Sequence, residues 1–138
     1  MRLRMPNRLR GRAFALAGLL WLVGCASEVT RHPVELSAAQ AAPPLRYVVS
    51  SPVVIELDSG YSRTVAAGTE FVEVGSIRQG RVLKPANSVF TIEGAHMHEA
   101  YPVVRDARIV GFYLPVEASF SPLSRHVAFP FQPRGSSK

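Results

Sequence analysis

The sequence contains a single cysteine, Cys25, among its 138 residues. One thiol excludes an intramolecular disulfide and a metal site built from several cysteines. A folded domain must therefore be stabilised by burial of apolar side chains, which about 85 to 90 residues can supply with a small margin. Sustained helical spacing of apolar residues is also missing from every stretch of ten or more residues after residue 45.

Acidic residues are absent from the first 25 positions. The chain has a formal net charge of +6, but five of its sixteen basic residues are arginines within residues 1–12. The part after Cys25 holds eleven basic and ten acidic side chains and is almost neutral. Nucleic-acid binding needs Lys and Arg clustered on one face to neutralise phosphates, and the remaining arginines are scattered. We therefore expect no nucleic-acid partner.

Groups for acid–base or nucleophilic catalysis are sparse. The only aspartates are Asp58 and Asp106, and both fall in predicted turns. Glu70 and Glu73 fall on opposite faces of one predicted strand. No serine has the small-residue frame of a nucleophile elbow. Because catalysis needs such groups to converge in a cleft, the sequence predicts a protein that is not an enzyme.

The first 24 residues have the organisation of an export signal. Residues 1–12 are basic, and residues 13–23 form an apolar run of eleven residues. A helix needs about 20 residues to span a bilayer, so this run is too short to be a membrane span. A basic start, a short apolar run and small residues at its end are typical of a secretory signal peptide. We assign residues 1–24 to this signal.

The end of this signal is Leu22-Val23-Gly24-Cys25. It resembles the lipobox of bacterial lipoproteins, in which a branched residue precedes two smaller ones and a cysteine. The resemblance implies that a type II signal peptidase cuts between Gly24 and Cys25. It also implies that the Cys25 thiol carries diacylglycerol, a covalent lipid and the only non-protein group we expect. The alternative interpretations are an ordinary secretory peptide and an uncleaved anchor.

Ala26 follows the cysteine. Among lipoproteins of bacteria with two membranes, a residue other than aspartate at this position implies transfer to the outer membrane. We therefore expect an anchor in the outer membrane with the domain facing the periplasm, and retention in the inner membrane is the alternative.

Three regions are predicted after the signal. Residues 25–45 are rich in Ala, Ser and Pro and are expected to form a flexible tether behind the lipidated cysteine. Residues 46–133 contain short β-branched and aromatic runs that turn residues interrupt about every ten positions, which predicts an all-β domain. Residues 134–138 are expected to be a disordered tail.

The predicted all-β domain is a small SH3-like barrel, with a compact β-sandwich as the alternative. Its clearest hairpin joins residues 101–104 to residues 109–114. In the second strand Val110, Phe112 and Leu114 are expected to share one face, and Tyr113 lies on the other. Since both faces are largely apolar, we expect this strand to be central in its sheet.

One cluster contains metal-ligand residue types. His96 and His98 are two apart, so in an extended segment their side chains point the same way, and Glu99 follows. A third ligand is not dictated by the spacing, and a structural zinc site usually has four. We therefore predict no metal at these residues, and the simpler interpretation is a pair of exposed histidines beside a turn.

Residues 114–133 combine four prolines with Phe120, Phe129 and Phe131. The prolines limit this segment to edge strand or extended coil. One interpretation is an exposed aromatic strip that binds a partner through these three rings. The other, which we favour, is an arm that wraps the domain and buries the rings, because each buried ring contributes about 1.5 to 3 kcal/mol.

The function expected from these observations is a lipid-anchored, non-enzymatic interaction module. Its partner would be another envelope protein, within a secretion, conjugation or envelope-assembly complex. The reasoning is architectural, because small β-domains commonly bind partners through edge strands and loops. Two alternatives stay open: a metal- or ligand-binding lipoprotein, and a structural lipoprotein that contacts the cell wall.

Overall fold

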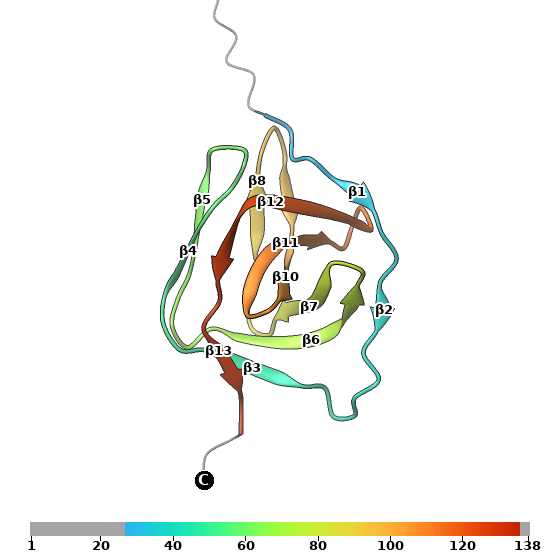
Figure 1. Cartoon of the computed structure of the whole chain (residues 1–138), viewed down its shortest axis with the longest axis vertical. Helices are drawn as coiled ribbons and strands as arrows, with labels where there is room; N and C mark the ends of the chain where they lie inside the picture. Colours follow the sequence, from blue (N-terminus) through green and yellow to red (C-terminus); the bar gives the residue numbers. More distant parts are fainter. Residues whose placement is uncertain (1–26, 136–138) are drawn as a thin grey trace, which may run out of the picture.

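A computed structural model of the chain describes residues 27–135 (Figure 1). The predicted signal, Cys25 and most of the predicted tail lie outside this range. The described residues form strands without any helix, so they include none that could cross a membrane. The strands are β1(His32–Pro33), β2(Ser37–Ala38), β3(Arg46–Val49), β4(Val53–Glu56), β5(Ser62–Val65), β6(Glu70–Ile77), β7(Gly80–Pro85), β8(Thr91–Glu93), β9(Met97–Glu99), β10(Tyr101–Arg105), β11(Arg108–Leu114), β12(Ser119–Ala128) and β13(Phe131–Pro133).

The predicted all-β fold is confirmed. Nine strands form one antiparallel sheet in the order β1-β12-β11-β10-β7-β6-β3-β13, with β2 paired to β6 beside this path. Two further ribbons, β4-β5 and β8-β9, are separate two-stranded sheets. The long sheet curves strongly, so that β12 crosses one end of the molecule and β6 and β3 the other (Figure 1). Its end strands β1 and β13 are not paired to each other in the described chain, and the SH3-like barrel stays a prediction.

The hairpin expected at residues 101–104 and 109–114 is present as β10 and β11. Its tip uses Asp106 and Ala107, whose φ angles are 50° and 55°. One detail differs from the prediction. In the β10–β11 pairing Val103 lies opposite Gly111 and Val104 opposite Ile109, so Val110 is an extra residue in β11 and interrupts the alternation. Val110 therefore faces the same cluster as Tyr113 rather than that of Phe112, because an extra residue in a strand reverses which face the next side chains occupy.

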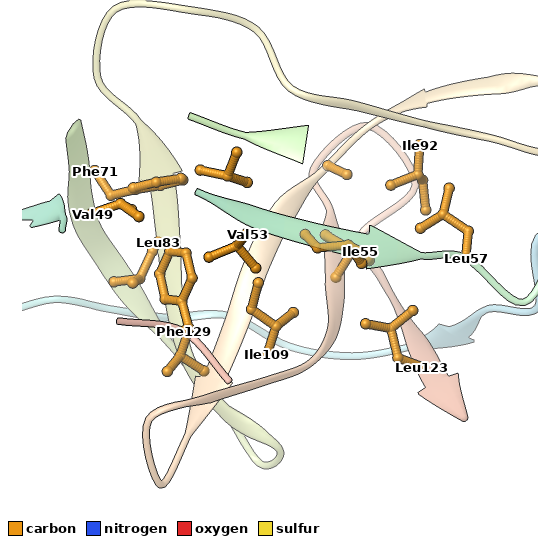
Figure 2. Close-up of a cluster of buried hydrophobic side chains, with 14 of the residues drawn as sticks. Val49, Val53, Ile55, Leu57, Phe71, Leu83, Ile92, Ile109, Leu123 and Phe129 are labelled. Atoms are coloured by element: carbon orange, nitrogen blue, oxygen red, sulfur yellow. The ribbon is translucent and has the colours of Figure 1, made fainter. Parts of the chain in front are cut away.

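The larger core cluster lies on the concave face of the sheet. Its biggest fully buried side chains are Phe71, Phe112 and Phe129. Figure 2 shows Val53 and Ile55, both from β4, among the side chains of this cluster. Alternation along β4 explains this, because Val53 and Ile55 are buried while Val54 and Glu56 are exposed. The β4-β5 ribbon therefore covers the core that the curved sheet leaves open.

A second cluster occupies the opposite face of the same sheet. It contains Ile77, Val82, Val103, Tyr113 and Phe120. Two partly buried residues of the N-terminal segment, Val34 and Leu36, pack against it. The central strands are therefore covered on both faces, as the apolar character of residues 109–114 led us to expect.

The segment predicted as a flexible tether differs from that expectation over residues 27–45. The backbone pairs β1 with β12 and β2 with β6. The Val34 amide also donates to the Ala118 carbonyl at 3.0 Å, and the Ala39 amide donates to the Val74 carbonyl at 3.0 Å. We call residues 27–39 the N-terminal strap. Backbone pairing holds it while most of its side chains stay exposed, so it leaves little apolar periodicity in the sequence.

Two glycines make room for the strap. A Cβ atom at Gly75 would lie 2.2 Å from the Ser37 carbonyl oxygen, and one at Gly94 would lie 2.7 Å from Val29 Cγ2. Both distances are shorter than any ordinary contact, so a side chain at either position would displace the strap. Gly94 therefore leaves space for the first part of the strap, and Gly75 leaves space for its last part.

Candidate interaction surface

The outer edge of β5 is an open backbone edge, because β5 pairs only with β4 in the described chain. The Leu57 amide donates to the Tyr61 carbonyl at 2.8 Å, which fixes the phase of the β4–β5 ladder. In an antiparallel pair, hydrogen-bonded and non-hydrogen-bonded positions alternate. The pairs Glu56–Ser62 and Val54–Thr64 are therefore non-hydrogen-bonded. The amides and carbonyls of Ser62 and Thr64 consequently point away from β4, toward the open edge.

A groove of about 340 Å³ runs along this edge. Residues 62–66 form one wall, and the opposite side includes Pro85, Ser88, Val89 and Phe90. Val89 is the most accessible apolar group there, with 72% of its surface exposed. The groove therefore combines unpaired strand backbone with apolar side chains, which are the two features that bind an extended peptide by strand addition.

Two side chains, one in the β4–β5 turn and one in β5, bind to β8. The Arg63 guanidinium donates to the Thr91 carbonyl at 2.7 Å and to the Thr91 hydroxyl at 2.6 Å. The Ser59 hydroxyl donates to the Glu93 carbonyl at 2.5 Å. The Thr91 and Glu93 carbonyls of β8 thus accept hydrogen bonds from side chains of the β4–β5 ribbon. In the described chain β5 and β8 are not paired as strands. The part of β5 around Thr64 remains open and lines the groove.

The two histidines that were considered as metal ligands lie in different surroundings, and the expectation that both are exposed is wrong for His98. His96 lies in the turn before β9 and is exposed, whereas His98 lies in β9 and is 6% exposed. The alternation that would align them holds only within a strand. Glu99 points elsewhere, since its carboxylate accepts a hydrogen bond from the Tyr101 hydroxyl at 3.2 Å. The described residues contain no group of three or more potential ligands.

His98 instead pairs with a carboxylate. Its Nδ1 lies 2.5 Å from Oε1 of Glu117, in the turn between β11 and β12. Arg31 of the strap approaches the same oxygen at 3.8 Å. Glu117 thus links the start of the strap to the β8–β9 ribbon. No motif in the sequence indicates this pairing, because the three residues are far apart in the chain.

The three phenylalanines assigned to partner binding are mostly covered. Phe129 is 1% exposed and its ring packs edge-on against Phe71 at 5.5 Å, while Phe120 is 6% exposed in the second cluster. Phe131 is half-buried. The burial of Phe120 and Phe129 does not fit a partner-binding site on an exposed strip, and it fits the covering arm that the sequence analysis favoured. The physical reason is that the sheet offers each ring an apolar site.

Phe131 closes the core at the end where β13 pairs with β3. Its ring packs edge-on against Tyr47 at 5.1 Å, and the Arg81 guanidinium lies 5.4 Å from each ring. The Tyr47 hydroxyl donates to Glu73 at 3.0 Å. Burial, followed by the bond to Glu73 and the charge of Glu73, raises the pKa of Tyr47. This tyrosine therefore stays protonated and keeps its bond at ordinary pH.

The candidate surface depends on topology rather than on a motif. The sequence predicts a short strand at residues 63–65, but no local signal says which of its edges lacks a neighbour. Comparisons with protein-family models, with curated proteins and with solved structures find no match. The β5 edge and its groove are therefore assigned a role from their geometry alone.

Proposed function

We propose that this chain is a lipid-anchored protein of the bacterial cell envelope whose β-domain is a non-enzymatic protein-interaction module. The lipid is carried by Cys25 and holds the protein in the outer membrane, with the domain facing the periplasm. The domain binds an extended segment of another envelope protein along the open edge of β5. The observation that carries the binding role is the unpaired backbone of Ser62 and Thr64 beside a groove of mixed polarity that Val89 and Phe90 help to line.

The anchor is supported by the sequence Leu22-Val23-Gly24-Cys25 after an apolar run of eleven residues. Intact mass measurement of protein purified from detergent-solubilised membranes tests it directly. Wild-type protein should start at Cys25 and carry acyl chains. A Cys25→Ser variant should lose the acyl chains and accumulate as precursor, because serine lacks the thiol that accepts diacylglycerol. Normal processing of that variant would contradict the anchor.

The binding role is supported by two properties of the β5 edge. Its outward amides and carbonyls can pair with an added strand, and backbone pairing supplies affinity without requiring a particular sequence. Val89 and Phe90 can contact alternate side chains of that strand, which would supply specificity. An exposed edge is also a risk for self-association, so a bound partner would protect it.

Proline at position 64 tests strand addition. The Thr64 amide points away from β4, so Thr64→Pro removes an outward donor and leaves the pairing within the ribbon intact. Thr64→Val keeps the donor and is the matched control. Chemical crosslinking in cells, followed by purification of the tagged lipoprotein, should capture one specific partner with wild type and Thr64→Val. Thr64→Pro should lose that partner while keeping the wild-type circular dichroism spectrum.

Equal capture by Thr64→Pro and Thr64→Val would refute binding at this edge. Capture of no specific partner by the wild-type protein would refute the interaction module itself. Co-sedimentation with purified cell walls then distinguishes the wall-binding alternative, since that role predicts binding without a protein partner.

A further inference from the structure

The chain enters the domain at one defined end of the molecule. The Ser27 carbonyl accepts a hydrogen bond from the Ala95 amide at 3.2 Å, in the turn between β8 and β9. Val29, two residues later, is 8% exposed and belongs to the large core cluster. Figure 1 shows the β4–β5 and β8–β9 turns together at this end, next to the entering chain. The Ser59–Glu93 hydrogen bond joins the two ribbons there.

Only two peptide steps separate Ser27 from Cys25. A fully extended chain spans at most about 3.6 Å per residue, so Ser27 lies within about 7 Å of the cysteine backbone. The headgroup region of one leaflet is roughly 5 to 8 Å thick. A lipid on Cys25 must place its acyl chains below that region. The β8–β9 turn, which is bonded to Ser27, is therefore held close to the headgroups.

The side chains at this end suit a lipid surface. Met97, in β9 beside the turn, has 67% of its surface exposed, and Tyr61, beside the β4–β5 turn, has 44% exposed. An apolar thioether and an amphipathic ring are both favoured at a membrane interface, where one part of the side chain is apolar and the other is wet. Neither residue has a role in either core cluster.

The carboxylates near this end have partners that limit repulsion from lipid phosphates. Glu28 lies 3.6 Å from Arg31, and Glu93 lies 3.5 Å from Arg63. The Asp58 carboxylate accepts hydrogen bonds from the Ser124 hydroxyl at 2.7 Å and from the Ser124 amide at 3.1 Å. The end therefore presents Met97 and Tyr61 without isolated negative charges at these three sites.

We propose that the end formed by the β4–β5 and β8–β9 turns is seated on the lipid surface, with Met97 and Tyr61 in the headgroup region. This inference rests on the proposed lipid anchor at Cys25. It replaces a domain on a long tether with one held directly against the membrane in a fixed orientation. Val89 lies five residues before Gly94, at most about 16 Å away along an extended chain, so its part of the β5 groove is expected to lie farther from the membrane than Met97.

The single cysteine makes a site-specific test possible. Lipidated full-length protein carrying Met97→Cys, Tyr61→Cys or Val89→Cys is labelled with a thiol-reactive fluorophore. Each variant is reconstituted in vesicles of phosphatidylethanolamine and phosphatidylglycerol, with or without a nitroxide quencher on the lipid headgroup. All three substituted residues are exposed apolar or amphipathic side chains, so Val89→Cys is a matched control. Circular dichroism and intact mass establish that each variant is folded and lipidated.

The expected result is strong quenching of the labels at positions 97 and 61 and no quenching above background at position 89. Inserting a flexible ten-residue Gly-Ser segment between Ala26 and Ser27 should weaken quenching at position 97. Equal quenching at positions 97 and 89, or none at either, in protein of confirmed lipidated mass would overturn the seating and leave the anchor standing. Labelling of the wild-type protein at Cys25 would instead show a free thiol, and both the anchor and the seating would fail.

Discussion

The two proline-containing segments at the ends of the domain are held to it in different ways. The C-terminal segment, residues 115–133, contributes large rings to both core clusters, with Phe129 in one and Phe120 in the other. The N-terminal strap contributes one buried side chain, Val29, and two partly buried ones, Val34 and Leu36. Its remaining attachment is backbone pairing and the Arg31–Glu117 contact.

This difference shows that proline content alone does not separate a tether from a structural element. Both segments pair with the sheet, but only the C-terminal one reveals this in its sequence, through its phenylalanines. Apolar burial stabilises by roughly 25 cal/mol per Å², whereas a backbone hydrogen bond contributes a net of about 1 kcal/mol. We therefore expect the C-terminal segment to be essential for folding and the strap to detach at a lower free-energy cost.

The largest expected effect is that of Phe129→Ala. The ring is fully buried between Phe71 and Phe131, at centroid distances of 5.5 and 5.3 Å. Replacing a buried phenylalanine by alanine costs about 3 to 5 kcal/mol, a large part of the stability of a small domain. Denaturant unfolding followed by circular dichroism should show this loss, and the exposed neighbour Gln132→Ala should show almost none.

The same variant separates the two interpretations of the C-terminal segment. A Phe129→Ala domain that keeps its wild-type stability but loses its crosslinked partner would restore the exposed aromatic strip and contradict the burial seen here. Loss of stability in Phe129→Ala together with near-normal stability in Phe129→Leu would support the covering arm, since leucine refills most of the volume.

A smaller effect is expected at the strap, from Gly75→Ala. The new Cβ would overlap the Ser37 carbonyl, so β2 must move away from β6. Overpacking of this kind costs about 1 to 3 kcal/mol. Hydrogen exchange should show faster exchange of the Ala39 amide, which donates to Val74, and unchanged protection of the Phe129 amide, which donates to Ala107.

Ser76→Ala, at the exposed neighbouring position, is the control and should leave both amides protected. Faster exchange of both amides in Gly75→Ala would mean that the strap and the C-terminal segment unfold together. The two ends would then be one cooperative unit, and the contrast drawn between them would be wrong.

The sequence predicts those features of the fold that depend on short stretches of neighbouring residues. The all-β class and the hairpin of β10 and β11 follow from alternation and turn residues within short stretches, and both are confirmed. The strap was missed because its attachment uses backbone groups and the clearance at Gly75 and Gly94, which only the folded arrangement explains. The bulge at Val110 in the β10–β11 pairing has no local signature either.

The candidate site was even less accessible to sequence reasoning. The His96–His98 spacing suggested one shared face, but β9 begins after His96, so only His98 follows the strand alternation. The open edge of β5 results from the sheet order, because strands adjacent in the chain need not be neighbours in space. A free edge is a property of the whole topology, and no residue type marks it.

The smallest expected effect is an alkaline loss of stability that reports on both ends. Tyr47 contacts β13, and Tyr101 packs in the cluster under the strap. Burial is the main cause that raises the pKa of each tyrosine. Glu73 raises the pKa of Tyr47 further, and Glu99 does the same for Tyr101. Below the ordinary tyrosine pKa of 10.0 both states are protonated, and this stability is fully present. As the pH rises above that value, the unfolded state ionises first, so the free energy of unfolding falls until the folded-state pKa is passed.

Urea unfolding at stepped alkaline pH should show a shallower fall in Tyr47→Phe and in Tyr101→Phe than in wild type. A fall that neither substitution changes would place the alkaline sensitivity elsewhere and remove tyrosine burial as a common feature of the two ends.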